Sequence, residues 1–169
     1  TKYTTVFVEY EGQLVSLIST LPNAFVKEAI QKKLLPAYKH YKIIQPEYAI
    51  KNHRIDFLLE DRTGDPFYLE VKSVSYVKNG VAKFPDSITK RGSKHLEDLS
   101  KMVTSGHKAV LLFLCMRSDV DRVRIAADLD SIYYANIKAA LKSGIKVICY
   151  DSQVTKFGVS LGKPIEFEI

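Results

Sequence analysis

The sequence contains little cysteine and no pattern of ligands typical of zinc. Its 169 residues include only two cysteines, Cys115 and Cys149, and neither has a histidine nearby. A structural zinc site needs about four such ligands close together, so the zinc-binding classes are excluded. Each cysteine lies within an apolar, strand-like segment, which predicts a buried and reduced thiol.

Long apolar segments are also missing. The longest unbroken apolar run, residues 109–116, is far shorter than the ~20 residues that cross a bilayer, so we interpret it as a buried strand. The N-terminus lacks the apolar stretch of a signal peptide, so we expect a cytoplasmic protein without a membrane partner. The chain has no initiator methionine and enters a strand pattern almost at once, so we expect a piece of a longer protein.

The sequence does contain enough apolar residues for one compact domain, together with an excess of positive charge. Apolar residues make up 46% of the chain. Lysine and arginine total 25 against 19 aspartate and glutamate residues, a net charge of +6. This balance suits a polyanionic partner such as DNA, because binding releases counterions, although many basic proteins bind nothing acidic. No zinc-finger or helix-turn-helix pattern indicates how bases would be recognised.

Hydrophobic periodicity predicts an α/β fold with a mixed central sheet flanked by helices. Short turns join three strands into an antiparallel meander, and helical crossovers make the later strands parallel. Asn23 is expected to cap the first helix and Pro36 to end it, while Asn79-Gly80 marks a tight turn. The predicted strands are 4–10, 13–18, 43–50, 54–60, 67–74, 109–116 and 145–150, the predicted helices are 23–35, 86–104 and 129–142, and a last hairpin is predicted within 157–169.

A pair of carboxylates is predicted on one face of the hairpin formed by strands 54–60 and 67–74. Because side chains alternate across a strand, Asp56 points away from one apolar face, and Glu70 and Lys72 point away from the other. A turn centred on Thr63 pairs residue 56 with residue 70, which places both carboxylates side by side. The apolar faces are expected to contain Ile55, Phe57 and Leu59 in the first strand and Phe67, Leu69 and Val71 in the second.

Two facing carboxylates repel each other unless a positive group lies between them. Mg²⁺ (or Mn²⁺) suits that place, because it binds a few carboxylates together with waters and phosphate oxygens. Lys72 is close enough to orient or deprotonate an attacking water, so the arrangement suits in-line attack on a phosphodiester. The alternative is a surface hairpin whose carboxylates pair with Arg54 and Lys72.

Two further glutamates and one helix are candidates for the site. Glu47 joins the carboxylate face if the preceding turn is at residues 51–52, and moves to the opposite face if that loop is one residue longer. Glu28 is expected to be solvated. In helix 86–104, one flank of the apolar stripe is positioned to hold phosphates, or else forms an ordinary solvated face. That flank carries Ser87, Arg91, Lys94 and His95, and the stripe consists of Ile88, Leu96, Leu99, Met102 and Val103.

The spacing of Asp56, thirteen residues and then Glu70-x-Lys72 resembles the PD-(D/E)XK nuclease signature, with Ile55 in place of the usual proline. The segments 53–59, 69–74, 84–86, 91–96 and 109–113 extend the match. In this order they resemble the sugar fermentation stimulation protein (SfsA) family, over about the whole chain.

The resemblance implies a restriction-endonuclease-like (PD-(D/E)XK) domain at residues 21–169 that binds DNA. Residues 1–20 would form a hairpin and link to an OB-like domain that this chain lacks. The implied catalytic residues are Asp56, Glu70 and Lys72, and Glu47 joins Asp56 and Glu70 in holding the metal. Nucleic acid would contact Arg54, Arg91, Lys94 and His95.

Two functions fit these observations. The first is a Mg²⁺-dependent DNA nuclease, which needs the acidic pair and the lysine on one face. The second is a DNA-binding regulator of sugar utilisation genes without catalysis, which needs only the positive charge. Because nucleases of this fold often act as dimers, a homodimer is also expected.

Overall fold

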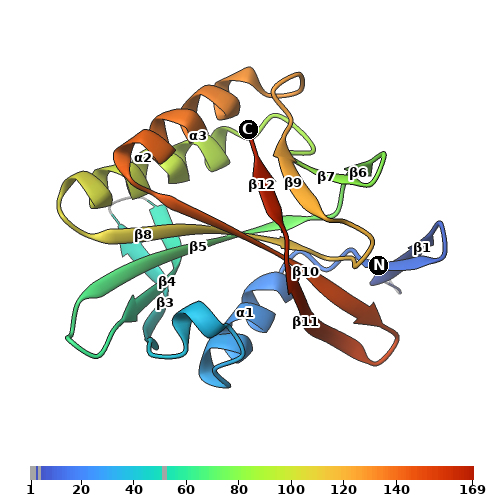
Figure 1. Ribbon diagram of the computed structural model, residues 1–169, viewed down its shortest axis with the longest axis horizontal. Coiled ribbons are helices and arrows are strands. Elements are labelled where there is room, and N and C mark those ends of the chain that lie inside the picture. Colours follow the sequence, from blue (N-terminus) through green and yellow to red (C-terminus); the bar gives the residue numbers. More distant parts are fainter. Residues whose placement is uncertain (1–2, 4, 51–52) are drawn as a thin grey trace.

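The centre of the molecule is a mixed six-stranded sheet with strand order β11-β10-β8-β5-β4-β3 (Figure 1). The computed structural model describes residues 3, 5–50 and 53–169. The antiparallel meander and the parallel later strands predicted from the sequence are both present, so the mixed α/β architecture is confirmed. The strands are β3 (Lys42–Ile50), β4 (His53–Glu60), β5 (Pro66–Val74), β8 (Lys108–Cys115), β10 (Lys146–Thr155) and β11 (Gly158–Pro164).

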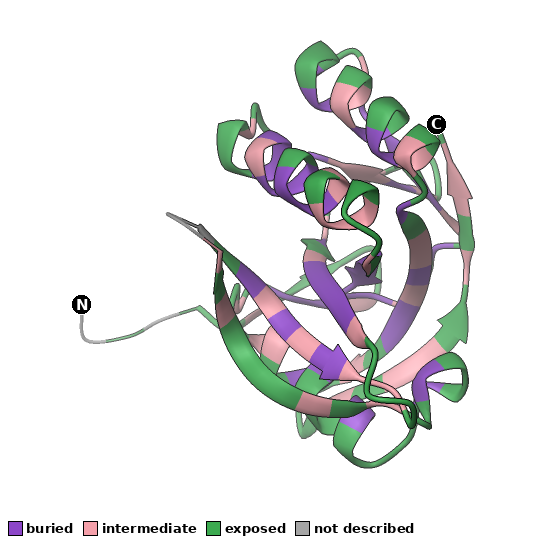
Figure 2. Cartoon of the chain, turned by 90° about the vertical axis from the view of Figure 1, so that its left-hand side faces the viewer, coloured by how far each residue is buried: buried purple, intermediate pink, exposed green. Residues whose placement is uncertain are grey.

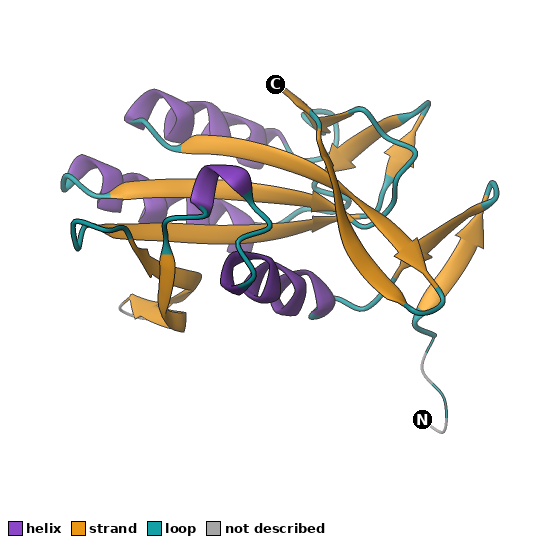
Figure 3. Ribbon diagram, turned by 60° about the horizontal axis from the view of Figure 1, so that its bottom comes forward, coloured by secondary structure: helices purple, strands orange, loops and turns teal. Residues whose placement is uncertain are grey.

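Helices cover both faces of this sheet. Helix α1 (Leu21–Gln31) and the short 3-10 helix η1 (Pro36–Tyr38) lie on one face. Helices α2 (Lys90–Thr104) and α3 (Ser131–Ser143) lie together on the other, as Figures 1 and 3 show. The result is a layered structure with a separate apolar core on each side of the sheet.

Strand β8 shows why the middle of the sheet is apolar on both sides. Leu111 and Phe113 pack in the core beneath α2 and α3, whereas Leu112 and Leu114 pack in the core beneath α1. A strand between two cores needs an unbroken apolar sequence, which accounts for the run at residues 109–116. Both cysteines are buried and free, as expected. The buried residues line the interior between the layers in Figure 2.

Two smaller sheets complete the described part of the chain. β1 (Phe7–Tyr10) and β2 (Gln13–Ser16) form the expected N-terminal hairpin. The second sheet has the order β12-β9-β7-β6, and its tight turn at Asn79-Gly80 was predicted. Its strands are β6 (Val77–Lys78), β7 (Val81–Phe84), β9 (Arg122–Ile125) and β12 (Glu166–Glu168). No helix in the described ranges combines the length and the apolar character needed to cross a membrane.

The ends of the helices differ from the sequence prediction. Helix α1 begins at Leu21 after Thr20 and ends at Gln31, so Asn23 lies inside its first turn and is not the cap. Helix α2 begins at Lys90 rather than at residue 86, because the Thr89 hydroxyl accepts a hydrogen bond from the Gly92 amide and caps the helix there. Ile88 therefore precedes the helix and is 72% exposed, so its place in the apolar stripe was wrong.

The predicted C-terminal hairpin within residues 157–169 was also wrong. β11 pairs antiparallel with β10, and β12 pairs parallel with β9 in the smaller sheet. Helix α3, by contrast, begins and ends close to the predicted positions. Asp130 caps its N-terminus, and Gly144 ends it with φ 103°, a left-handed conformation that glycine adopts without strain.

Candidate functional site

The predicted carboxylate pair lies where strands β4 and β5 separate. Phe57 pairs with Leu69 and continues the predicted register, in which residue 56 is opposite residue 70. At that position each carboxylate accepts a hydrogen bond from a backbone amide of the other strand, in place of a bond between the two backbones. The Asp56 amide donates to Oε2 of Glu70 at 3.3 Å, and the Val71 amide donates to Oδ2 of Asp56 at 2.7 Å. The fold therefore holds both acidic groups at a fixed opening in the sheet.

The strand alternation that predicted this site breaks at Asp56 itself. Phe57 and Leu59 pack in the core beneath α1, but Ile55 packs in the core beneath α2 and α3, so the predicted common face was wrong for Ile55. Opposite residue 56, Glu47 has φ 49°, a left-handed conformation that residues other than glycine rarely adopt, whereas the bulge between β3 and β4 lies at Ile43–Gln45. Next to Glu47, Tyr48 also packs against the α2 side of the core.

Glu70 is the most enclosed charged group of the site, with 1% of its surface exposed. Its Oε1 accepts a hydrogen bond from Nζ of Lys72 at 2.6 Å and contacts Nδ1 of His95. Lys72 Nζ also lies 3.3 Å from that imidazole nitrogen. Burial raises the pKa of Glu70, but the hydrogen bond with His95 and the charge of Lys72 outweigh it, so the pKa stays below its usual value.

The pKa of Asp56 shifts in the opposite direction from that of Glu70. Burial and then the negative charge of Glu70 raise the pKa of Asp56 to about 6, although the Val71 amide and Asn23 act against the shift. The Asn23 side chain donates to Oδ1 of Asp56 at 2.7 Å. Asn23 is thus a residue of the site that sequence reasoning assigned to a helix cap. Its contact joins residues 33 positions apart, which no local pattern indicates.

The basic residues predicted for the site do not all lie in it. Arg91, on the exposed edge of α2, donates from Nε to Nε2 of His95 at 3.4 Å and so extends the cluster toward solvent. Lys94 instead pairs with Glu97 at 3.1 Å and with Asp98 at 3.6 Å on the outer surface of α2. Arg54 is exposed beside the separation of the strands.

The two further glutamates differ in their contacts. Glu47 lies opposite residue 56, as the shorter turn predicted, but it is exposed and has no hydrogen bond or ion pair with another described residue. Glu28 is exposed and pairs with Lys32, as expected. Of these two, only Glu47 lies on a strand beside the carboxylate pair.

The acidic pair has the donor chemistry for a hard divalent cation. No group of three or more acidic, histidine or cysteine side chains with metal-binding geometry occurs in the described ranges. Mg²⁺ nevertheless needs only one or two protein carboxylates, since waters and substrate phosphates supply the rest. Burial and then the charge of Glu70 raise the pKa of Asp56, and a cation between the two carboxylates would offset both effects, so the residues fit such an ion.

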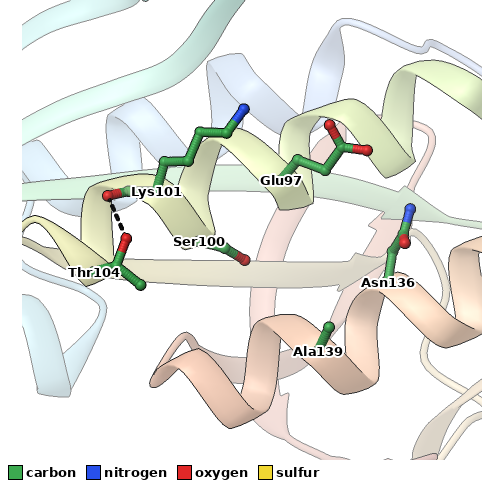
Figure 4. Close-up of a pocket in the computed structure, with 6 residues that line it drawn as sticks. All are labelled: Glu97, Ser100, Lys101, Thr104, Asn136 and Ala139. Atoms are coloured by element: carbon green, nitrogen blue, oxygen red, sulfur yellow. Dashed lines mark hydrogen bonds between the residues drawn. The ribbon is translucent and has the colours of Figure 1, made fainter.

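A hollow lies between helices α2 and α3, and neither Asp56 nor Glu70 is among the residues that line it (Figure 4). It has a volume of about 300 Å³, and its Ser100 and Thr104 hydroxyls already donate to carbonyl groups of their own helix. No charged group of the carboxylate cluster lines it. The hollow is lined by Glu97, Ser100, Lys101, Thr104, Asn136 and Ala139.

Comparison with known proteins identifies the family. The model of the sugar fermentation stimulation protein RE domain matches residues 20–158. The chain belongs to the SfsA family. This confirms the resemblance drawn from the sequence motifs, whose residues 53–59 and 69–74 carry the carboxylate pair.

SfsA relatives match nearly the whole chain. The sugar fermentation stimulation protein homolog of Rhodospirillum centenum is 39% identical over 165 residues, which cover 96% of this chain and 71% of the relative. The homolog of Bartonella henselae is 42% identical over 160 residues, 93% of this chain and 68% of the relative. The structure of Pyrococcus furiosus SfsA in complex with Ca²⁺ superposes with a TM-score of 0.92 at 24% identity, over 99% of this chain and 72% of that one. The last match establishes the fold.

Proposed function

We propose that this SfsA domain has a restriction-endonuclease-like (PD-(D/E)XK) core and hydrolyses DNA phosphodiester bonds with Mg²⁺ or Mn²⁺. The observation that carries the proposal is the buried Asp56–Glu70 pair, held by backbone amides at an opening of the sheet with Lys72 beside it. A purely structural ion pair has no need of a second buried carboxylate, whose charge is unfavourable there.

Asp56 and Glu70 would hold the cation, and Glu47 would complete the set from the opposite strand. When bound, the cation would polarise a phosphate oxygen and offset the charge that develops during attack. The amides of Asp56 and Val71 fix the carboxylates, so little reorganisation is needed. Pyrococcus furiosus SfsA was crystallised with Ca²⁺, which supports a divalent-cation site in the family.

Lys72 is the residue expected to act on the nucleophile. Its side chain is 13% exposed and its ammonium group is bonded to Glu70, so Lys72 lies between the acidic pair and the solvent side of the site. There it would orient the attacking water and stabilise the negative charge on phosphate. His95 and Arg91 continue the positive strip outward, in the position for a DNA backbone. Arg54 and Lys94 would add weaker phosphate contacts from the surface.

The net charge of +6 supports DNA as the partner. A homodimer, a cytoplasmic location and a boundary near residue 20 between link and nuclease-like domain stay predictions. The non-catalytic DNA-binding regulator remains the competing function. It requires the same basic surface but gives Asp56 and Glu70 no chemical role.

Supercoiled plasmid with Mg²⁺ or Mn²⁺ separates these functions. We expect wild type to nick the plasmid, and Asp56→Asn, Glu70→Gln and chelation to abolish nicking. Asp61→Asn is the matched control, because Asp61 is a carboxylate of the same hairpin at its exposed turn, and this variant should nick normally. If wild type shifts DNA in a gel, with or without chelator, but cleaves with neither metal, the regulator is the correct function.

A further inference from the structure

Tyr133, near the start of α3, has a buried hydroxyl group without a partner. The residue is 0% exposed, and its hydroxyl makes no hydrogen bond within the described part of the chain. An unpaired buried hydroxyl destabilises the fold, a penalty that phenylalanine would avoid. The hydroxyl therefore suggests a function that the packing of the ring does not explain.

The ring of Tyr133 lies tightly against helix α2. A methyl group added to Gly92 would lie 2.8 Å from Oγ1 of Thr89 and 3.1 Å from Cε2 of Tyr133, so glycine leaves room for both the helix cap and the ring. The other side of the ring packs edge-on against Phe84, with centroids 5.3 Å apart. The backbone amide of Tyr133 donates to Oδ1 of Asp130 at 2.8 Å, which fixes the residue in the first turn of α3.

This position is on the same side of the sheet as Glu70. His95 follows Gly92 by about one helical turn, so both lie on the same face of α2, and His95 contacts the Glu70 carboxylate. Tyr133 also shares its core with Leu111, the residue paired with Glu70 in the sheet. Burial and then the charge of Glu70 raise the pKa of Tyr133, so the phenol remains a neutral hydrogen-bond donor.

We propose that Tyr133 is a positioning residue whose hydroxyl holds Glu70 when Lys72 turns toward substrate. In the structure, Lys72 and His95 both bind Oε1 of Glu70, and the phenol is left without an acceptor. Once Lys72 leaves to contact phosphate, the carboxylate loses a donor, and the Tyr133 hydroxyl supplies the replacement. Glu70 then keeps the orientation needed to hold a cation. This inference rests on the proposed function.

The test compares Tyr133→Phe with Tyr134→Phe, in the intact chain. Tyr134 is the adjacent residue of the same helix and is partly exposed. Nζ of Lys138 lies 5.1 Å from the centroid of the Tyr134 ring. Both variants lose one phenolic oxygen and nothing else. The readouts are the thermal unfolding midpoint without metal, Mn²⁺ affinity by calorimetry without DNA, and the rate of plasmid nicking.

For Tyr133→Phe we expect an unchanged or higher thermal unfolding midpoint. We also expect the Mn²⁺ affinity and the nicking rate to fall by about 10- to 100-fold, the usual effect of losing a group that orients a metal ligand. Tyr134→Phe should match wild type in all three. A Tyr133→Phe variant with wild-type Mn²⁺ affinity and rate would overturn the inference and leave the nuclease standing. A marked fall in its midpoint would also overturn it, since the hydroxyl would then be a structural bond. If wild type neither binds Mn²⁺ nor nicks DNA, the proposed function fails first.

Discussion

The two ends of the β4–β5 hairpin carry the same kinds of side chain in opposite electrostatic states. At the turn, Asp61 and Asp65 lie 3.2 and 3.5 Å from Nζ of Lys108. Hydrogen bonds from Thr63, the charge of Lys108 and the Asp65 amide hold the pKa of Asp61 well below its usual value. The Asp61 carboxylate there accepts several hydrogen bonds, and the Asp65 side chain is exposed to water.

At the other end, Asp56, Glu70 and Lys72 form a similar set of two carboxylates and one lysine. Here burial comes first among the causes that raise the pKa of Asp56 to about 6, followed by the charge of Glu70. Residue types alone therefore do not distinguish a stabilised surface cluster from a reactive site. What separates them is the cover of helix α2, which removes water from one end of the hairpin only.

Replacing the lysine at each end sharpens this comparison and has the largest expected effect. Lys72→Met should lower the rate of plasmid nicking by about 10²- to 10⁴-fold, because it removes the group that orients water and meets negative charge. Lys108→Met removes an equally long cation from exposed carboxylates and should leave the rate unchanged. Single-turnover nicking at saturating DNA measures both. Equal losses in the two variants would show that general surface charge, and not the buried site, limits the reaction.

Loosening the cover over the buried end is expected to have an intermediate effect. Asp130 is buried and accepts hydrogen bonds from the Tyr133 amide at 2.8 Å and the Thr89 amide at 2.9 Å, so it joins the first turns of α2 and α3. Asp130→Ala should lower the free energy of unfolding by about 1–3 kcal/mol, since it removes a cap and leaves a second amide unpaired.

Urea unfolding checks this value. Asp128→Ala, an exposed aspartate two residues earlier, is the control and should stay within about 0.5 kcal/mol of wild type. A similar loss in both variants would mean that Asp130 contributes only surface charge.

Local patterns predicted most of the fold but not its short, distant pairings. Helical periodicity and apolar runs identified the three helices and the strands of the large sheet other than β11, because each of these elements is long enough to show its period. Strand β9 was missed within a charged segment, although Arg122 and Arg124 alternate with Val123 and Ile125. Its partners β7 and β12 are far away in the sequence, so pairing supplies a stability that the segment itself does not show.

The same reasoning explains how far the site could be predicted. The register of one tight hairpin sufficed to bring Asp56, Glu70 and Lys72 together, because strand pairing is a local rule. Asn23 reaches the site from helix α1 through packing that the sequence does not specify locally, and the role inferred for Tyr133 depends on packing of the same kind. The prediction for Ile55 failed for a third reason, since the alternation on which it depended breaks at Asp56, opposite the left-handed residue Glu47.

The smallest effect is expected at the exposed end, where the comparison can be tested by pH. The pKa of Asp61 is lower in the folded protein than its ordinary value of 3.8, so the folded state favours the ionised form. The stability that Asp61 contributes is therefore complete above about pH 4 and is lost as the pH falls through the depressed folded pKa. Asp61→Asn should be slightly less stable than wild type at pH 7, and the difference should shrink on acidification below pH 4.

Thermal unfolding of both proteins from pH 7 to pH 2 measures this difference in stability. A gap that stays constant, or widens in acid, would show that Asp61 is not the strongly ionised partner of Thr63 and Lys108, and the contrast between the two ends of the hairpin would be lost.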